Sequence, residues 1–174
     1  MTLKYEIKFL DYWHVGSGLS AGAKLDALVL KDSDNLPFVG GKTIKGLVRE
    51  MAELLNDETF VDACFGQEGV DMGSVYFSNA TLSKTVSEQI ISHTLQDNLY
   101  DEVASTTIDA EGMAIDGSLR EIEVTVPVTL RGEIDDVSKE HTEKMTQALK
   151  MIKRMGLNRN RGLGRCEITV EVAS

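Results

Sequence analysis

Both ends of the chain alternate apolar and polar residues. At 3–9 and again at 166–172, every second residue is apolar, and the residues between them are charged or polar. Successive side chains of a strand point to opposite faces of a sheet. The alternation therefore predicts two strands, each with one face buried against a core.

Two inner segments have the apolar spacing of amphipathic helices. In the first, apolar residues recur at i, i+3, i+4, i+7 and i+11, which predicts a helix of about a dozen residues. These residues are Ile44, Leu47, Val48, Met51 and Leu55. In the second, Ser138 can cap the helix start. Its apolar stripe consists of Met145, Ala148, Leu149, Ile152 and Met155. We expect the glycine-rich segment that follows to end this second helix.

The segments between these elements are less regular. Residues 25–31 are typical of a second extended piece, 75–77 of a short strand, and 122–130 of a long strand. Pro127 indicates an edge or a bulge in the long strand, because proline has no amide hydrogen to donate. Residues 84–120 combine weak periodicity with several turn formers, so we expect a protruding insertion there.

The order of elements is strand, helix, strands, helix, strand. This order favours an α+β fold with helices on one face of a largely antiparallel sheet, as in ferredoxin-like domains. The 174 residues are enough for one domain of ordinary size with a real core. We therefore predict a single domain, residues 1–174, that contains the insertion.

Composition is that of an ordinary soluble protein, with 42% hydrophobic and 26% charged residues. No apolar run approaches the roughly 20 residues of a membrane helix, and the chain does not open like a signal peptide, so we expect no membrane partner. Cys64, Cys166 and the scattered histidines lack the spacing of a zinc site. We read the cysteines as reduced, which favours a cytoplasmic location.

The net charge of −10 hides two regions of opposite sign. Residues 56–143 hold 19 acidic and 4 basic residues, whereas the rest of the chain holds 9 acidic and 14 basic ones. Net charge alone argues against nucleic acid, but a local basic patch is what contacts phosphate. The acidic region is either a solvated face or a surface for a basic neighbour.

The basic residues are densest near the C-terminus. Residues 150–165 include six basic residues and no acidic one, and 156–165 include three glycines and three arginines. Glycine lets backbone amides approach a phosphate closely, and arginine supplies forked, permanently charged donors. The segment is therefore a candidate polyanion-binding loop. The plain alternative is a basic helix end and a tight loop before a strand.

A second candidate is the segment 40–46, Gly-Gly-Lys-Thr-Ile-Lys-Gly, before the first helix. It imitates the end of a P-loop, but the opening glycine would have to stand where Leu36 is, so a nucleotide site is disfavoured. A helix N-terminus with free amides beside Lys42 and Lys45 could still hold a phosphodiester. A plain strand-to-helix turn is the alternative.

Two single residues could carry chemistry. Asp26 follows a glycine-bearing loop and precedes an apolar segment. It could position an attacking ribose hydroxyl or bind a divalent metal near a scissile phosphate, or it could be an ordinary loop aspartate. His14 could act as an acid or base in a metal-independent nuclease, although a lone histidine after a strand more often packs or forms hydrogen bonds.

Several short segments follow one another in an order typical of a known family. They are His14–Gly18, Asp26–Asp32, Leu36–Gly46, Phe65–Gly66, Val75–Ala80, Thr107–Ala114, Leu119–Glu121 and Arg161–Gly164. Each motif is loose, but the ordered set is specific and spans nearly the whole chain. The chain thereby resembles the RAMP superfamily, in particular the repeated backbone subunits of type III CRISPR effector complexes.

The resemblance implies a ferredoxin-like, RNA-recognition-like core whose copies stack into a filament on guide CRISPR RNA, with target RNA and other effector subunits as further partners. It implies a thumb within 84–120 that wedges between nucleotides, and target cleavage at Asp26 with Mg²⁺ or Mn²⁺. The residues expected to bind RNA are His14, Gly16, Ser17, Gly18, Lys42, Thr43, Lys45, Arg49, Asn158, Arg159, Arg161, Gly162, Gly164 and Arg165. The alternative is a structural or capping subunit that binds guide RNA while Asp26 is inert.

Overall fold

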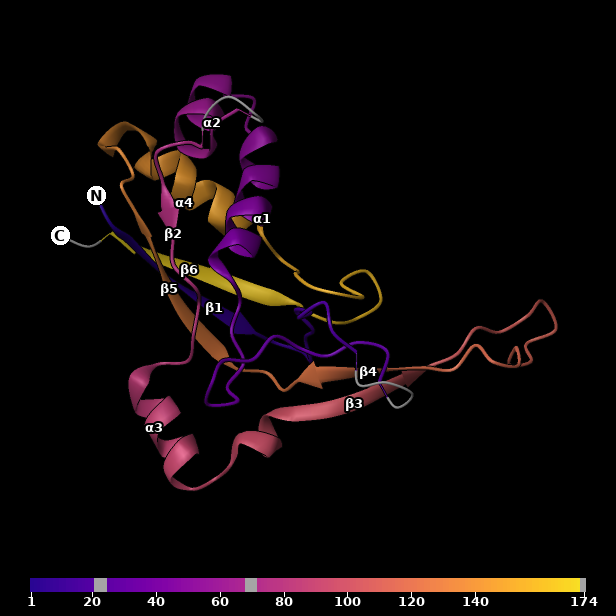
Figure 1. The fold of residues 1–174 in the computed structure, drawn as a ribbon. Helices are drawn as coiled ribbons and strands as arrows, with labels where there is room; N and C mark the ends of the chain where they lie inside the picture. Colours follow the sequence, from indigo (N-terminus) through magenta and orange to yellow (C-terminus); the bar gives the residue numbers. More distant parts are fainter. Residues whose placement is uncertain (21–24, 68–71, 173–174) are drawn as a thin grey trace.

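A four-stranded antiparallel sheet forms the centre of the molecule (Figure 1). The computed structural model describes residues 1–20, 25–67 and 72–172. The strands of the sheet are β1 (Leu3–Phe9), β2 (Tyr76–Phe77), β5 (Thr129–Asp135) and β6 (Cys166–Val172). Their order is β2-β5-β1-β6, and each neighbouring pair is antiparallel. With one helix after β1 and one after β5, this is the ferredoxin-like arrangement, so the predicted α+β fold is confirmed.

Helices pack on one face of this sheet. They are α1 (Gly41–Glu53), α2 (Glu58–Phe65) and α4 (Thr142–Met151), which lie together above the strands in Figure 1. The alternate apolar residues of β1 are buried beneath them together with Ile44, Val48 and Leu149. The periodicities of the sequence therefore located the core correctly, although they did not predict α2.

The opposite face of the sheet is polar. The residues of β1 between the buried ones are charged, and two of them form ion pairs with β5, Lys4 with Glu133 and Glu6 with Arg131. Exposed pairs of this kind contribute little to stability. This face is therefore solvated in the isolated chain.

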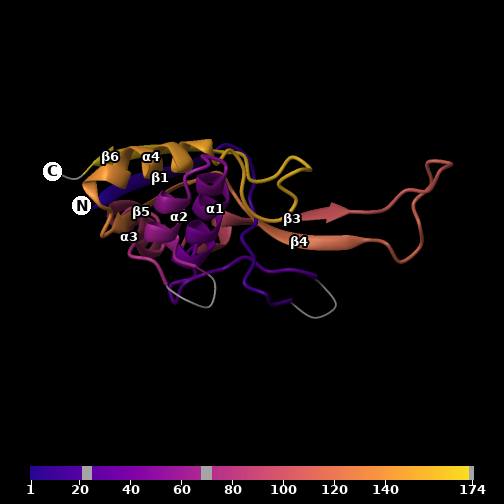
Figure 2. The same cartoon turned by 90° about the horizontal axis from the view of Figure 1, so that it is seen from above.

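The connection between β2 and β5 leaves the sheet. It contains α3 (Lys84–Ser92), a 3₁₀ turn (Gln96–Leu99), β3 (Tyr100–Ser105) and β4 (Arg120–Thr125). Strands β3 and β4 pair as a separate hairpin that extends away from the sheet in both views (Figures 1 and 2). We call residues 100–125 the arm and residues 106–119 the arm tip. The domain and thumb boundaries predicted from the sequence stay predictions.

The prediction of one long strand at 122–130 is wrong, because this segment forms two strands that belong to different sheets. Strand β4 belongs to the arm and β5 to the central sheet, with Pro127 in the interruption. The flanking amide of Val126 bonds to the carbonyl of Leu99. Pro127 has no amide to offer a strand neighbour, so the chain changes partners at this residue.

The second helix also differs from its prediction at both ends. Ser138 precedes a 3₁₀ turn (Lys139–His141) and makes no side-chain cap, and α4 begins only at Thr142. At the other end the helix stops at Met151, so the buried Ile152 and Met155 lie beyond it. Packing against the core, rather than helix continuation, explains why those two positions are apolar.

The extended segment 25–31 forms isolated bridges to neighbouring segments rather than a strand. Positions 21–24 of the glycine-bearing loop before Asp26 lie outside the described residues. Within 1–20, 25–67 and 72–172, no helix is long and apolar enough to cross a membrane.

Candidate nucleic-acid interface

The basic segment near the C-terminus folds into a closed loop, residues 154–165. A bridge between Arg154 and Arg165 closes it, and the Met155 amide donates to the Gly164 carbonyl at 3.0 Å. Gly156 and Gly164 have φ values of +90° and +71°. A Cβ at Gly156 would collide with the His14 carbonyl oxygen, and one at Gly164 with the Met155 carbonyl oxygen. These two glycines therefore serve loop closure.

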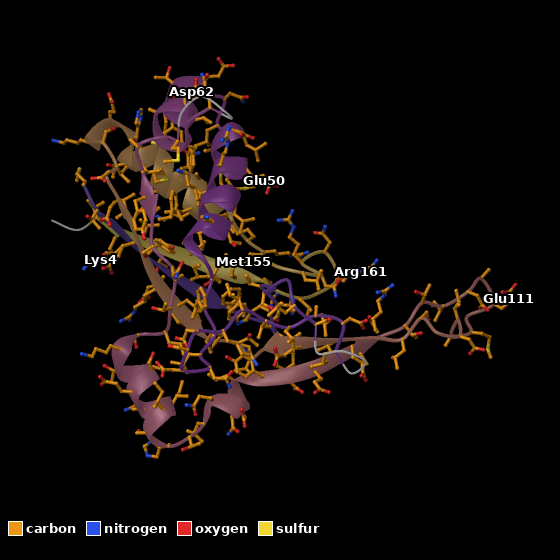
Figure 3. The ribbon with its side chains drawn as sticks, in the orientation of Figure 1. Lys4, Glu50, Asp62, Glu111, Met155 and Arg161 are labelled. Carbon is orange, nitrogen blue, oxygen red and sulfur yellow. The ribbon has the colours of Figure 1, made fainter. Side chains whose placement is uncertain are left out.

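The arginines of the loop differ in how far they are engaged. Arg165 pairs with Asp11 at 3.1 Å, and Arg159 lies 3.9 Å from Glu50 of α1. Arg161 is exposed, and its guanidinium has no partner among the residues that the structure describes. Figure 3 shows Arg161 at the outer end of the loop. It is thus the loop arginine most available to a phosphate.

The remaining loop residues named from the sequence shape this outer end. Asn158 has a φ of +56°, and its carbonyl accepts the Arg161 amide at 2.8 Å. Gly162 has a φ of +94°, and a Cβ there would meet nothing within 4 Å, so the backbone is approachable from that side. The turn over 158–162 therefore presents Arg161 on a tight, glycine-bearing backbone.

The closed loop rests on the segment after β1. The Gly164 amide donates to the Tyr12 carbonyl and the Leu157 amide to the His14 carbonyl, both at 2.8 Å. The His14 ring is only 2% exposed, and its Nδ1 lies 2.6 Å from the Glu123 carbonyl, which can only accept. His14 thus joins the loop to β4 from inside. Direct RNA contact or acid–base chemistry would require an accessible ring, whereas the ring of His14 is buried.

The segment 16–18 pairs with the segment that contains Asp26. Gly16 bridges Val29, and both the amide and the hydroxyl of Ser17 donate to the Leu28 carbonyl at 3.0 and 3.1 Å. Gly18 has a φ of +79°, and a Cβ there would meet nothing within 4 Å. These bonds hold the turn 16–18 against the segment that contains Asp26.

Asp26 lies against β4, at the end of the β3–β4 pair that is next to the arm tip. Its amide donates to the Glu121 carbonyl at 2.8 Å, and its Oδ2 accepts the Glu121 amide at 2.9 Å. The residue is exposed, so its Oδ1 can reach solvent or a ligand. Arg120, which precedes Glu121 in the chain, is also exposed and has no side-chain partner in the described part of the chain. We did not single out Arg120 from the sequence, although it is the only basic residue between Lys84 and Arg131.

A buried carboxylate fixes the segment that carries Asp26. Glu123 of β4 is 9% exposed, and its two oxygens accept the Val29 amide at 3.0 Å and the Lys31 ammonium at 2.7 Å. The same ammonium lies 3.8 Å from the centre of the Tyr100 ring, a cation–π contact. Burial, and secondarily the charge of Glu123, raises the pKa of Tyr100. This cluster joins both arm strands to the 25–31 segment.

The start of α1 is a weaker anion site than the sequence suggested. The Gly41 amide donates to Asn79 Oδ1 at 2.9 Å, so a neighbouring side chain already uses one of the amides predicted to be free. Lys42 and Thr43 are exposed at this end of the helix. Farther along, Lys45 donates to the Met72 carbonyl at 3.0 Å, while Arg49 pairs with Glu53 at 2.9 Å. Lys45 and Arg49 are thus already partly engaged within the chain, which leaves fewer of their donors for RNA.

The described residues contain no group of three His, Cys, Asp or Glu side chains placed to hold a metal ion. Asp26 could supply a single carboxylate oxygen. Magnesium is commonly held by one or two carboxylates, with phosphate and water oxygens completing the shell. The site therefore fits an ion delivered with RNA better than a permanently bound one.

Comparison with known families decides the classification. The family model of the RAMP superfamily matches residues 6–167, nearly the whole chain. The chain belongs to the RAMP superfamily. The match covers the loop 154–165, the segment 14–18, Asp26 and the arm, so every segment of the candidate interface lies within the RAMP region.

Solved structures support the same fold. Among the 202 chains that match significantly, one comes from the cryo-EM structure of type III-B Cmr-beta bound to cognate target RNA, with a TM-score of 0.78 and 12% identity over 98% of this chain and 97% of that one. Another, from the apo state of type III-B Cmr-beta, has a TM-score of 0.76 and 12% identity over the same shares. A search of curated proteins finds no match. At this identity, the likeness shows the RAMP fold alone.

Proposed function

We propose that this protein is an RNA-binding backbone subunit of a type III CRISPR effector complex. RAMP membership supports the proposal, as does the fold shared with chains of type III-B Cmr-beta, one of them bound to target RNA. The observation that carries it is the convergence along β4. The segment 14–18 and Asp26 bond to β4, and the loop 154–165 bonds to the carbonyls of Tyr12 and His14.

The proposed RNA path runs past Arg161 and Arg120. Both guanidiniums are exposed and unpaired among the described residues, so neither must break an ion pair to meet a phosphate. Lys42 at the start of α1 is a further exposed donor. In this proposal base pairing between guide and target RNA reads the sequence, while the protein contacts the backbone, as in other RNA-guided effectors.

RNA binding is tested by replacing Arg159 and Arg161 with alanine. Each lost phosphate contact lowers the salt dependence of single-strand binding by about 0.7 in the slope of log K against log salt, so the double variant should lose about 1.4. Fluorescence anisotropy across a salt series measures this slope. Arg131→Ala is the matched control, because Arg131 pairs with Glu6 on the polar sheet face. An unchanged slope in the double variant would remove these arginines from the RNA path.

Target cleavage at Asp26 is the finer part of the proposal. The carboxylate either accepts the proton of an attacking ribose hydroxyl or takes part in holding Mg²⁺ or Mn²⁺ at the scissile phosphate. When bound, the ion would neutralise charge that develops on the phosphate. The amide of Glu121 orients Asp26 through Oδ2, which leaves Oδ1 for either role. Arg120 would hold the same phosphate from the side.

Asp26→Asn separates cleavage from binding. The asparagine carbonyl oxygen can still accept the Glu121 amide, and exposed substitutions usually change stability by less than about 0.5 kcal/mol, so fold and RNA affinity should be kept. Losing a positioned acid–base group should slow cleavage by about 100- to 10,000-fold. The assay uses the assembled complex and labelled target RNA, with magnesium, manganese or chelator. Asp34→Asn, at an exposed turn position, is the control.

The second candidate function is a non-catalytic RAMP subunit that binds guide RNA. The hydrogen bonds of Asp26 favour it, because the Asp26 amide and Oδ2 both bond to the backbone of Glu121, as a purely structural aspartate would. Cleavage by neither the wild-type protein nor Asp26→Asn would support this alternative. Equal cleavage by both would instead place the active site elsewhere.

Assembly and location complete the proposal. Copies would stack head to tail along guide RNA beside other effector subunits, in the cytoplasm, where the two free cysteines would stay reduced. Electron microscopy and light scattering with guide RNA should show multimers. A strict monomer at saturating RNA would contradict the backbone role.

A further inference from the structure

A cleft lies between α1 and the loop 154–165. It has a volume of about 300 Å³ and continues to the end of α4. Its apolar part is made by Leu47 and Met51 of α1 together with Met151 and Ile152. The basic residues that line it are Lys153, Arg154 and Arg159. Several cations beside apolar side chains form a surface that fits the phosphate and the sugar of a nucleotide.

One acidic side chain stands among these cations. Glu50 is the only carboxylate among the described residues that line the cleft, and it lies 3.9 Å from the guanidinium of Arg159. Figure 3 shows Glu50 on α1, above the loop that carries Arg161. A carboxylate repels phosphate and can only accept hydrogen bonds, so Glu50 lowers the affinity of the cleft for any polyanion. Its place beside the cations suits a ligand that brings a hydrogen-bond donor as well as a phosphate.

The ion pair between Glu50 and Arg159 is easily exchanged. The side chain of Glu50 is 55% exposed and that of Arg159 43%, and pairs this exposed contribute little to stability. Arg154 gives one guanidinium N–H to the Arg159 carbonyl at 3.3 Å and keeps its other donors. Lys153 is exposed and has no side-chain partner in the described part of the chain. A phosphate can therefore take Arg159 away from Glu50, which leaves the carboxylate to accept another donor.

RNA brings such a donor next to each phosphate. Its 2′-hydroxyl is on the sugar carbon next to the one that carries the 3′-phosphate, so a group beside a bound phosphate also meets the hydroxyl. DNA has no hydroxyl at this position. We propose that Glu50 makes the cleft selective for RNA over DNA, by accepting a hydrogen bond from the 2′-hydroxyl of the nucleotide whose phosphate meets Arg159. This inference rests on the RNA binding included in the proposed function, and it names the residue that recognises the sugar.

Glu50 acts on the two nucleic acids in opposite ways. For DNA it supplies only repulsion from the phosphates, because no sugar donor reaches it. For RNA the hydrogen bond to a charged acceptor offsets that repulsion. Every ribonucleotide carries the 2′-hydroxyl, so this contact works on any guide sequence and leaves the reading of bases to base pairing. A carboxylate that accepted from a base amino group would instead make affinity depend on the base at that position.

Two oligonucleotides of the same sequence isolate the hydroxyl. One is single-stranded RNA and the other is 2′-fluoro RNA, which keeps the sugar geometry of RNA but has no 2′ donor. Fluorescence anisotropy gives a dissociation constant for each. A hydrogen bond to a charged group is worth about tenfold in affinity, so the wild-type protein should bind RNA at least about tenfold more tightly than 2′-fluoro RNA. Equal affinities in the wild type would overturn the proposal without any variant.

Variants at position 50 connect this preference to the carboxylate. In Glu50→Ala the ratio of the two dissociation constants should fall about tenfold, and 2′-fluoro RNA should bind more tightly than to the wild type because the repulsion is gone. Glu50→Gln keeps an acceptor oxygen without the charge, so its ratio should lie between those of the wild type and Glu50→Ala. Glu53→Gln makes the same change of charge about one turn along α1, at an exposed residue outside the cleft lining. It should keep the wild-type ratio, whatever it does to the two affinities.

The two proposals fail differently. RNA binding with the same ratio in the wild type and in Glu50→Ala would overturn the role of Glu50 and leave the RNA-binding function intact. A ratio that falls equally in Glu53→Gln would also overturn it, since the effect would then come from charge on α1 in general. A wild-type protein that binds neither oligonucleotide would overturn both proposals. Position 50 is exposed on a helix and alanine favours helices, so these variants should fold like the wild type.

Discussion

Removing the buried carboxylate of Glu123 should weaken the whole arm base. Glu123→Ala deprives the Val29 amide and the Lys31 ammonium of their acceptor, bonds of 3.0 and 2.7 Å. Breaking a buried ion pair by removing one partner costs about 3–5 kcal/mol. The Lys31 side chain is 24% exposed and keeps its contact with Tyr100, so the lower end, about 3 kcal/mol, applies.

Two further variants divide this loss into its parts. Glu123→Gln keeps an oxygen for the Val29 amide but loses the charge that pairs with Lys31, so it should cost about 1–2 kcal/mol. Glu121→Gln changes a half-buried carboxylate of the same strand, whose side chain has no partner among the described residues, and should stay within about 0.5 kcal/mol of the wild type. The expected order of stability is therefore wild type and Glu121→Gln, then Glu123→Gln, then Glu123→Ala.

Urea unfolding and thermal melts measure these differences. For a chain of this size, a loss of about 3 kcal/mol lowers Tm by roughly 6–12 °C. Amide hydrogen exchange adds a local readout, because the Val29 amide should lose protection in Glu123→Ala even if the core stays closed. If Glu123→Ala melted within a degree of the wild type with Val29 still protected, the carboxylate would not hold this segment.

Three more predictions follow, one from close approach and two from burial. Gly164→Ala should destabilise the protein by several kcal/mol more than Gly162→Ala. Both positions require a positive φ, but only a Cβ at position 164 collides with the Met155 carbonyl. Urea unfolding compares the two variants, and equal losses of stability would contradict the loop geometry. Burial raises the pKa of Cys64 and of Cys166 from the ordinary 9.0 to about 11, so neither thiol should react with a disulfide reagent at pH 8 without unfolding. Because the folded protein favours the neutral thiols, their contribution to stability is complete below pH 9 and is lost as the pH rises towards about 11. A melting temperature that stays constant over this pH range would contradict this prediction.

Local periodicity was enough to predict the core of this fold. The alternation at 3–9 and 166–172 and the stripe of the first helix each correspond to an element with its apolar face buried. Each of these segments buries one face only, so the sequence repeats with the period of its own secondary structure. The order of these elements then restricted the topology to a ferredoxin-like arrangement.

The same reasoning failed where a segment changes partners or is covered on both faces. Alternation continues through 122–130, but the missing amide of Pro127 divides it between the arm and the central sheet. Glu123 looks like an outward residue of an alternating strand. It is buried because the segment with Val29 and Lys31 covers that face of β4.

The candidate interface shows the same division. Residue types and spacing identified the basic glycine loop, the 14–18 segment and Asp26, because glycine conformation and charge are properties of short segments. Which of these side chains are free could not be predicted in this way. His14 is buried and Lys45 and Arg49 are engaged, whereas the exposed Arg120 is the chain neighbour of Glu121, which meets Asp26 only because β4 pairs with the segment that contains Asp26. Sequence determined the elements and the chemistry each can offer; tertiary structure decided which groups meet, since burial and pairing depend on segments far apart in the chain.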